Sequence, residues 1–291
     1  MVCKSYRILL LVLFVFNTYI KAITVTQTLY LNKGEFVAII DSNKAPYYSF
    51  NSSKVFNAKN ALLKLSTSDV LILKIINTDT IIHGFNIKNH TPLNSIINAG
   101  DSITHTLTFN SEGVFIYYDS YQYPKYKYMG AAGMICVNNT DIVKNYYWNI
   151  KDHELSYNKQ LDSNKTVNWE KYSPEWHTIN SLSFFHTIMN DSTINVNAKL
   201  GDTIRINIAN TGQSARSIHI HGFHGKIIYS SVPKQIGRIK DSFPIPKMET
   251  MQIEIVADQI GTYSAHDNNL TATTGNGTPP FGLITFIVIE K

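Results

Sequence analysis

The stretch GDTIRINIANTGQSARSIHIHGF, residues 201–223, contains most of what the sequence says about the fold. Ile204, Ile206 and Ile208 alternate with polar residues, which is typical of a β-strand with one buried face. Further on, His219 and His221 are two residues apart, so on a strand their imidazoles project from the same face. Neutral imidazole is a ligand for both copper and zinc. The stretch therefore predicts two strands and the beginning of a metal site.

Strands of this kind follow one another along the 291-residue chain. Short β-branched and aromatic runs are separated by Gly, Asn, Asp and Ser, as in VLILKIIN (70–77), GVFIYYD (113–119) and LITFIVIE (283–290). No long helical periodicity occurs. Many short strands at regular spacing favour a β-sandwich, so we predict an all-β protein.

The pattern of residues 201–223 has a counterpart earlier in the chain, DVLILKIINTDTIIHGFNI (69–87). Each half then continues with a strand that ends in a Gly-x-Phe/Tyr corner, a polar loop and a closing apolar strand. A repeat of this length indicates two copies of one domain. We place domain 1 at 23–140 and domain 2 at 179–291. The polar, Tyr- and Trp-rich segment 141–178 between them is expected to be an extended connector with one strand.

The N-terminus has the pattern of an export signal. Lys4 and Arg7 precede the apolar run ILLLVLFVF (8–16), which is too short to span a membrane, and Ala22 is a candidate last residue before cleavage. We predict a signal peptide at 1–22 and a secreted or periplasmic mature protein with no membrane attachment after cleavage. An uncleaved anchor is the alternative, because Ile20 stands where a small residue is preferred.

The composition excludes some classes of partner and cross-link. The net charge is +5 with scattered basic residues, so nothing indicates a nucleic-acid partner. Cys3 would leave with the signal, and Cys136 alone cannot form an internal disulfide. In the apolar run GMICV, Cys136 is expected to be a small buried hydrophobe.

The order SIHIHG (217–222), GTYSAH (261–266) and FGLITFIV (281–288) resembles the cupredoxin domains of multicopper oxidases and copper nitrite reductases. KYSPEWHTIN (171–180) resembles the connector of their two-domain members. The resemblance implies two cupredoxin-like Greek-key β-sandwich domains and a copper cofactor. In that family, paired His-x-His motifs supply ligands to type 2 and type 3 coppers.

The resemblance assigns the metal ligands of domain 2 to His219, His221 and His266. His266 matches the first member of a second His-x-His pair, whereas Asn268 replaces the second member. Three imidazoles within reach of one another can hold Cu(II) or Zn(II), with water at an open position. His224, a few residues further on, is expected to be a solvent-edge histidine.

The same resemblance predicts that type 1 blue copper is absent. Asp267 stands at the cysteine position of domain 2, and Leu283 stands at the position of the axial methionine. In domain 1, His83 stands where a type 1 histidine is expected, but Tyr118 and Asp119 replace the following His-Cys pair. Because a blue site depends on the Cu–thiolate bond, neither domain is expected to hold one.

Three functions are compatible with these residues. The first is a secreted copper-binding protein with a His-rich site of type 2/3 character in domain 2. The second is a divergent copper oxidoreductase in a homo-oligomer such as a trimer, where His83 faces His219 and His221 of another copy. The third is a metal-free cupredoxin-fold binding or scaffold module, so enzymatic activity stays open.

The tyrosine-rich segment YYDSYQYPKYKYMG (117–130) is interpreted as an aromatic loop packed at the domain interface. A stacking or sugar-binding surface, or a redox-active path beside copper, is the alternative.

Overall fold

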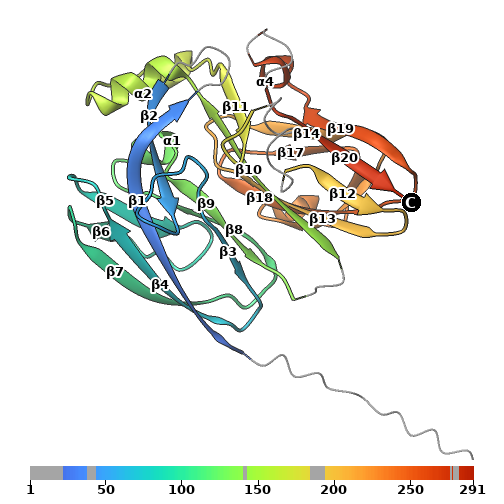
Figure 1. Cartoon of the computed structure of the whole chain (residues 1–291), viewed down its shortest axis with the longest axis horizontal. Helices are drawn as coiled ribbons and strands as arrows, with labels where there is room; N and C mark the ends of the chain where they lie inside the picture. Colours follow the sequence, from blue (N-terminus) through green and yellow to red (C-terminus); the bar gives the residue numbers. More distant parts are fainter. Residues whose placement is uncertain (1–21, 38–43, 140–142, 184–193, 276, 278–281) are drawn as a thin grey trace, which may run out of the picture.

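The computed structural model describes residues 22–37, 44–139, 143–183, 194–275, 277 and 282–291. The predicted signal peptide lies outside these ranges except for its last residue. No helix within them is long and apolar enough to cross a membrane. Figure 1 shows two β-sandwiches side by side.

Domain 1 consists of two packed sheets. The first has the strand order β2-β1-β4-β7, and its strands are β1 Thr24–Val37, β2 Lys44–Asn51, β4 Val70–Asn77 and β7 Ser102–Thr108. The second has the order β3-β9-β8-β5-β6, and its strands are β3 Leu62–Leu65, β5 His83–Ile87, β6 Ser95–Ile97, β8 Gly113–Tyr118 and β9 Ala132–Val137. Alternate residues of β4 (Leu71, Leu73 and Ile75) lie in the core between the sheets, as the alternation predicts.

Domain 2 is a second sandwich. Its six-stranded sheet has the order β11-β10-β13-β18-β15-β16, with strands β10 Lys144–His153, β11 Trp176–Ile179, β13 Thr203–Asn210, β15 Gly225–Ser230, β16 Ile239–Lys240 and β18 Glu249–Val256. Its five-stranded sheet has the order β12-β20-β19-β14-β17, with strands β12 Val196–Lys199, β14 Arg216–Ile220, β17 Ser242–Ile245, β19 Gly261–Asp267 and β20 Ile284–Glu290. Ile204, Ile206 and Ile208 of β13 are fully buried in its core. The prediction of an all-β protein with two cupredoxin-like sandwiches is confirmed.

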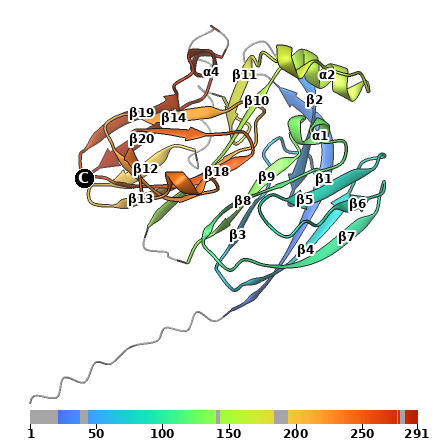
Figure 2. The same cartoon turned by 180° about the vertical axis from the view of Figure 1, so that it is seen from behind.

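The remaining elements are short helices. They are α1 Lys125–Tyr128, α2 Leu155–Asp162, η1 Trp169–Lys171, η2 Pro233–Gln235 and α4 Leu270–Thr274. Figure 2 shows α1 and α2 as neighbours at the end of domain 1.

The segment expected to be a connector with one strand has two strands, an α-helix and a short 3-10 helix among its described residues. β10 runs parallel to β13 and antiparallel to β11, so both strands extend the sheet of domain 2. Trp148 and Ile150 of β10 are fully buried in the core of that domain. Their neighbours Asn149 and Lys151 are also buried, because they face domain 1 and hydrogen-bond to its carbonyl oxygens. The sequence of β10 alternates apolar and polar residues here, but it does not show that the polar face is buried against another domain.

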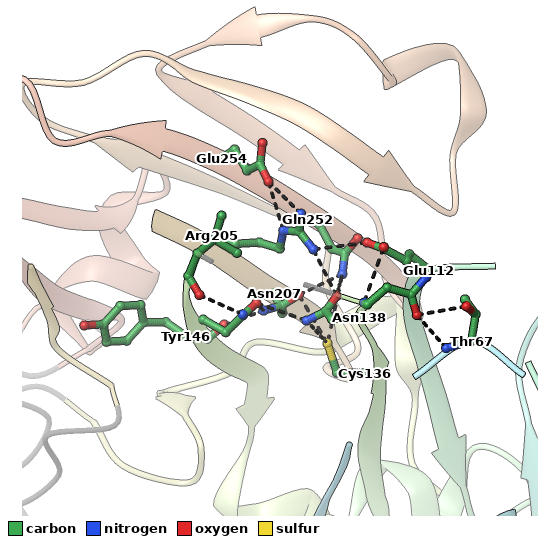
Figure 3. A network of polar contacts seen from close by, with 12 residues as sticks. Thr67, Glu112, Cys136, Asn138, Tyr146, Arg205, Asn207, Gln252 and Glu254 are labelled. Atoms are coloured by element: carbon green, nitrogen blue, oxygen red, sulfur yellow. Dashed lines mark hydrogen bonds and ion pairs between the residues drawn. The ribbon is translucent and has the colours of Figure 1, made fainter. Parts of the chain in front are cut away.

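The two domains share a buried interface with an apolar and a polar part. Val114 and Met134 of domain 1 pack with Ala209 and Met248 of domain 2. Beside this cluster lies a polar network that joins β9, β13 and β18 (Figure 3). The domains are therefore held by specific pairings as well as by apolar contact.

In that network, Asn207 Oδ1 accepts hydrogen bonds from Cys136 Sγ (3.2 Å) and Gln252 Nε2 (2.8 Å), as Figure 3 shows. Cys136 is buried, as predicted, and burial raises the pKa of its thiol to about 12. At neutral pH the sulfur is therefore a protonated donor within the interface.

Candidate metal site

The three histidines assigned to domain 2 lie next to one another. β14 and β19 are antiparallel neighbours, and their register places His219 directly opposite His266. His221 follows the end of β14, and its backbone N–H donates to Ser264 O (2.9 Å). The ring centroids are 4.7 Å apart for His219 and His221, 5.0 Å for His221 and His266, and 5.6 Å for His219 and His266. The spacing of two within SIHIHG and the strand pairing thus gather all three imidazoles.

Hydrogen bonds to the backbone fix which ring nitrogen of two histidines carries the proton. His219 Nδ1 lies 3.1 Å from Asp241 O and 3.0 Å from Ser242 Oγ, and His266 Nδ1 lies 2.9 Å from Asp267 O. A carbonyl oxygen can only accept, so both Nδ1 atoms donate and both Nε2 atoms keep a free lone pair. This pairing of Nδ1–H with a carbonyl is what commonly orients a metal-binding histidine.

The Nε2 atoms of His221 and His266 are 2.9 Å apart. Because His266 Nε2 is an acceptor, His221 Nε2 donates this hydrogen bond when no metal is bound. When two nitrogens each lie about 2.0 Å from one metal and the angle between them at the metal is roughly a right angle, their separation is close to that of these two Nε2 atoms. A metal ion could therefore take the place of the shared proton.

Burial, together with the neighbouring His219 and His266, lowers the pKa of His221. This imidazole is therefore neutral at pH 7, which is the form that binds metals.

The arrangement is nevertheless not a finished three-ligand site. Among the residues that the structure describes, no group of three or more His, Cys, Asp or Glu side chains has the geometry to hold a metal ion. The His221–His266 pair fits a metal by its spacing, whereas His219 lies beside this pair with its Nδ1 held by β17. A metal bound by all three imidazoles requires a rotation of the rings.

A buried ion-pair network supports the base of this cluster. Arg216, the first residue of β14, donates to Asp152 Oδ2 of β10 and to Asp267 Oδ2 of β19 (3.4 Å). All three side chains are almost fully buried. Burial alone would raise the pKa of Asp152, but the Arg216 charge and hydrogen bonds from residues 213 and 214 hold it well below its usual range. No motif in the sequence indicates this network, since Asp152 and Arg216 are 64 residues apart along the chain.

Asp267 occupies the position that the family resemblance gives to the blue-copper cysteine. Its carboxylate points to Arg216 and to the backbone N–H of Asn269 (2.9 Å). Leu283, at the position of the axial methionine, is buried in the core. Neither side chain belongs to the histidine cluster. His224 is exposed, as predicted.

In domain 1, His83 is fully buried, with both ring nitrogens engaged. Its Nδ1 is 2.6 Å from Asp119 Oδ2, and its Nε2 is 3.2 Å from Asp79 Oδ2. The carboxylate at the expected cysteine position therefore forms an ion pair with the expected ligand histidine. This burial contradicts the arrangement in which His83 faces His219 and His221 of another copy.

The tyrosine-rich segment 117–130 is mainly part of the domain 1 core. Tyr117, Tyr126 and Tyr128 are buried there, whereas Tyr121 is half-buried and Tyr123 is exposed. These rings are packed, but inside domain 1 and not at the domain interface, where the sequence predicted them. The half-buried ring belongs to a groove described below.

Comparisons with known proteins agree with this architecture. Residues 156–276 match the family model of the multicopper oxidases. No curated protein matches the chain significantly.

Among solved structures, the blue copper oxidase from Nitrosomonas europaea is similar, with a TM-score of 0.77, 20% identity and coverage of 92% of this chain and 86% of that chain. The multicopper oxidase mgLAC has a TM-score of 0.77, 17% identity and coverage of 92% and 87%. The copper nitrite reductase from Nitrosomonas europaea has a TM-score of 0.74, 17% identity and coverage of 92% and 94%. Together with the sandwich topology and the matched segment, these similarities show that the chain has the cupredoxin-like, two-domain fold of multicopper oxidases and copper nitrite reductases.

Proposed function

We propose that this chain is an exported copper-binding protein with one histidine-rich site in domain 2 and no type 1 blue copper. The observation that carries the proposal is the 2.9 Å approach of His221 Nε2 to His266 Nε2, with His219 beside them. The backbone acceptors of His219 and His266 support it, because they engage both Nδ1 atoms and leave the Nε2 atoms as the nitrogens that can bind a metal. The family match and the neighbours' copper support copper over zinc.

The surrounding residues define what each imidazole does at this site. When bound, copper supplies a redox-active Lewis acid with coordination positions left for water. His221 and His266 would hold it through their Nε2 atoms, and His219 is the third imidazole that could join them. Arg216 neutralises Asp267 and so keeps that carboxylate turned away from the histidines. Export rests on the charged and apolar pattern of residues 1–22.

The proposal is tested by copper content. After copper loading and desalting, elemental analysis of the full chain should give about one copper per molecule. The variant His219→Ala/His221→Ala should retain almost none, because it removes two ligands and leaves an isolated imidazole. The matched control is His224→Ala, an exposed histidine close in sequence, which should bind as the parent does. Equal retention by all three proteins would contradict the site.

A metal-free binding or scaffold module is the second candidate. It is favoured by the hydrogen bond between His221 and His266, which satisfies both nitrogens without a metal, and by the lack of a finished three-ligand geometry in the described residues. Absence of copper from the parent protein after loading would select it. A strong thiolate-to-copper absorption band would contradict the proposed absence of blue copper.

A further inference from the structure

A groove that plays no part in the histidine cluster runs along one end of domain 1. It has two lobes, with volumes of about 520 Å³ and 430 Å³, and both are lined by Gln122, Lys125 and Asn164. α1 and its preceding turn form one wall, and α2 with the loop that follows it forms the other (Figure 2). Lobes of this size are typical of small-molecule sites.

The charge of the groove is positive. Lys33, Lys125 and Lys165 line it, whereas Asp162 is the one acidic residue among its lining side chains. That carboxylate already pairs with Lys33 at 2.6 Å. The Lys125 ammonium instead donates to a neutral acceptor, Asn164 Oδ1 (2.7 Å). Two lysines are thus left to attract an anion.

Flat aromatic surface lines both lobes. Tyr121 and Tyr126 belong to one lobe, but Tyr126 is buried and its ring centroid lies 4.8 Å from the Lys125 ammonium, so the half-buried Tyr121 offers the accessible face there. Trp169, half-buried, belongs to the other. Aromatic faces of this kind favour a ligand that is itself a ring.

Amide groups complete the lining. Gln122 and Asn164 are exposed, and each offers an acceptor oxygen together with N–H donors. Gln122 has a φ of 48°, in the left-handed region, within the turn that leads into α1. Amides at both lobes suit hydroxyl groups on the ligand, since each hydroxyl both donates and accepts.

From these features we propose that the groove binds a cyclic carboxylate, with a sugar acid as the form that uses the lysines, the rings and the amides together. The carboxylate would pair with Lys125 or Lys165, and the ring would lie against the aromatic faces. This proposal does not depend on copper binding, so the two can fail separately.

The test is binding of D-glucuronate to the full-length protein, measured by isothermal titration calorimetry, with D-glucose as the neutral probe of the same ring size. Glucuronate should bind and glucose should bind at least about tenfold more weakly, since charged hydrogen bonds contribute most. Benzoate is the second carboxylate. If glucuronate binds and benzoate does not, the ligand class is the sugar acids. If benzoate binds and glucuronate does not, the cyclic carboxylate that the groove takes is an aromatic acid. No binding of either, or equal binding of glucose and glucuronate, overturns the proposal.

Variants assign the binding to the groove. Lys125→Gln/Lys165→Gln should weaken binding of the carboxylate about tenfold, while Lys159→Gln should leave it unchanged. Lys159 is an exposed lysine of α2 that does not line the groove, so it tests the loss of one lysine charge outside the lining. An unchanged thermal midpoint shows that the double variant is folded. Undiminished binding by a folded double variant places the ligand elsewhere and overturns the assignment.

Discussion

At the scale of single residues, His83 has surroundings that its sequence context does not suggest. Burial alone would lower its pKa, but hydrogen bonds and the charges of Asp119 and Asp79 overcome burial and raise it. The folded protein therefore holds this proton more tightly than the unfolded chain, where the pKa of histidine is about 6.5. The stability contributed by protonated His83 is fully present below that value and is lost as the pH rises through the raised, folded-state pKa.

The variant His83→Gln should accordingly lower the free energy of unfolding by about 3 kcal/mol in mildly acidic solution, because two buried carboxylates lose their cation. The deficit should shrink as the pH is raised through the raised, folded-state pKa of His83. Urea unfolding at a series of pH values measures it, with the exposed His224→Gln as the control expected to change stability by less than about 0.5 kcal/mol. A deficit that is the same at every pH would show that protonation of His83 contributes nothing.

At the scale of elements, Arg216 of β14 contacts both its sheet neighbour β19 and β10 of the opposite sheet. This guanidinium is almost fully buried between the carboxylates of Asp152 and Asp267. Its removal leaves two buried anions without a partner, which costs far more than the loss of a surface ion pair.

We therefore expect Arg216→Met to destabilise the protein by about 3–5 kcal/mol, measured by chemical unfolding. Arg238→Met changes the same residue type at an exposed site and should cost less than about 0.5 kcal/mol. If Arg216→Met were as mild as the control, the network would not be a structural support of the histidine cluster.

The elements also show which parts of the structure are encoded locally. Alternating Ile204, Ile206 and Ile208 predict β13, and the spacing of His219 and His221 predicts their proximity, because both follow from the two-residue period of a strand. The partners of β10 have no such signal. Asn149 and Lys151 are buried polar residues whose acceptors are Ala132 O and Gly130 O, contributed by another domain. The polar side chains of such a strand find their hydrogen-bond partners in a distant part of the chain. When only the sequence is known, the strand therefore resembles a loop.

At the scale of the whole molecule, the interface of the two sandwiches is closed by buried amides. Asn207 accepts from Cys136 and Gln252, and its own Nδ2 donates to Tyr146 O (3.0 Å). Arg205 of β13 extends the same network to Glu112 of domain 1 at 3.1 Å and to Glu254 of β18 at 2.7 Å (Figure 3). Two of these contacts, Cys136 to Asn207 and Glu112 to Arg205, join the domains, so separation of the domains breaks both of them together.

We expect a single unfolding transition in differential scanning calorimetry, with equal calorimetric and van't Hoff enthalpies. Asn207→Ala should lower stability by about 1–3 kcal/mol, because buried donors lose their acceptor. The exposed Asn98→Ala is the matched control. Two resolved transitions in the parent protein would show that the sandwiches unfold independently.

β10 follows domain 1 in the chain but pairs with β13, and its Trp148 donates to Ile194 O (2.9 Å) inside domain 2. A fragment starting at residue 179 would lack this strand, which would leave β13 with an unpaired edge and the second core without its tryptophan. A protease that cut the chain between residues 153 and 176 would likewise leave β10 bound to the sheet, although it belonged to the other piece. The physical border of the second sandwich thus precedes Lys144, and any gene dissection, domain exchange or split reporter based on this fold must carry β10 with domain 2.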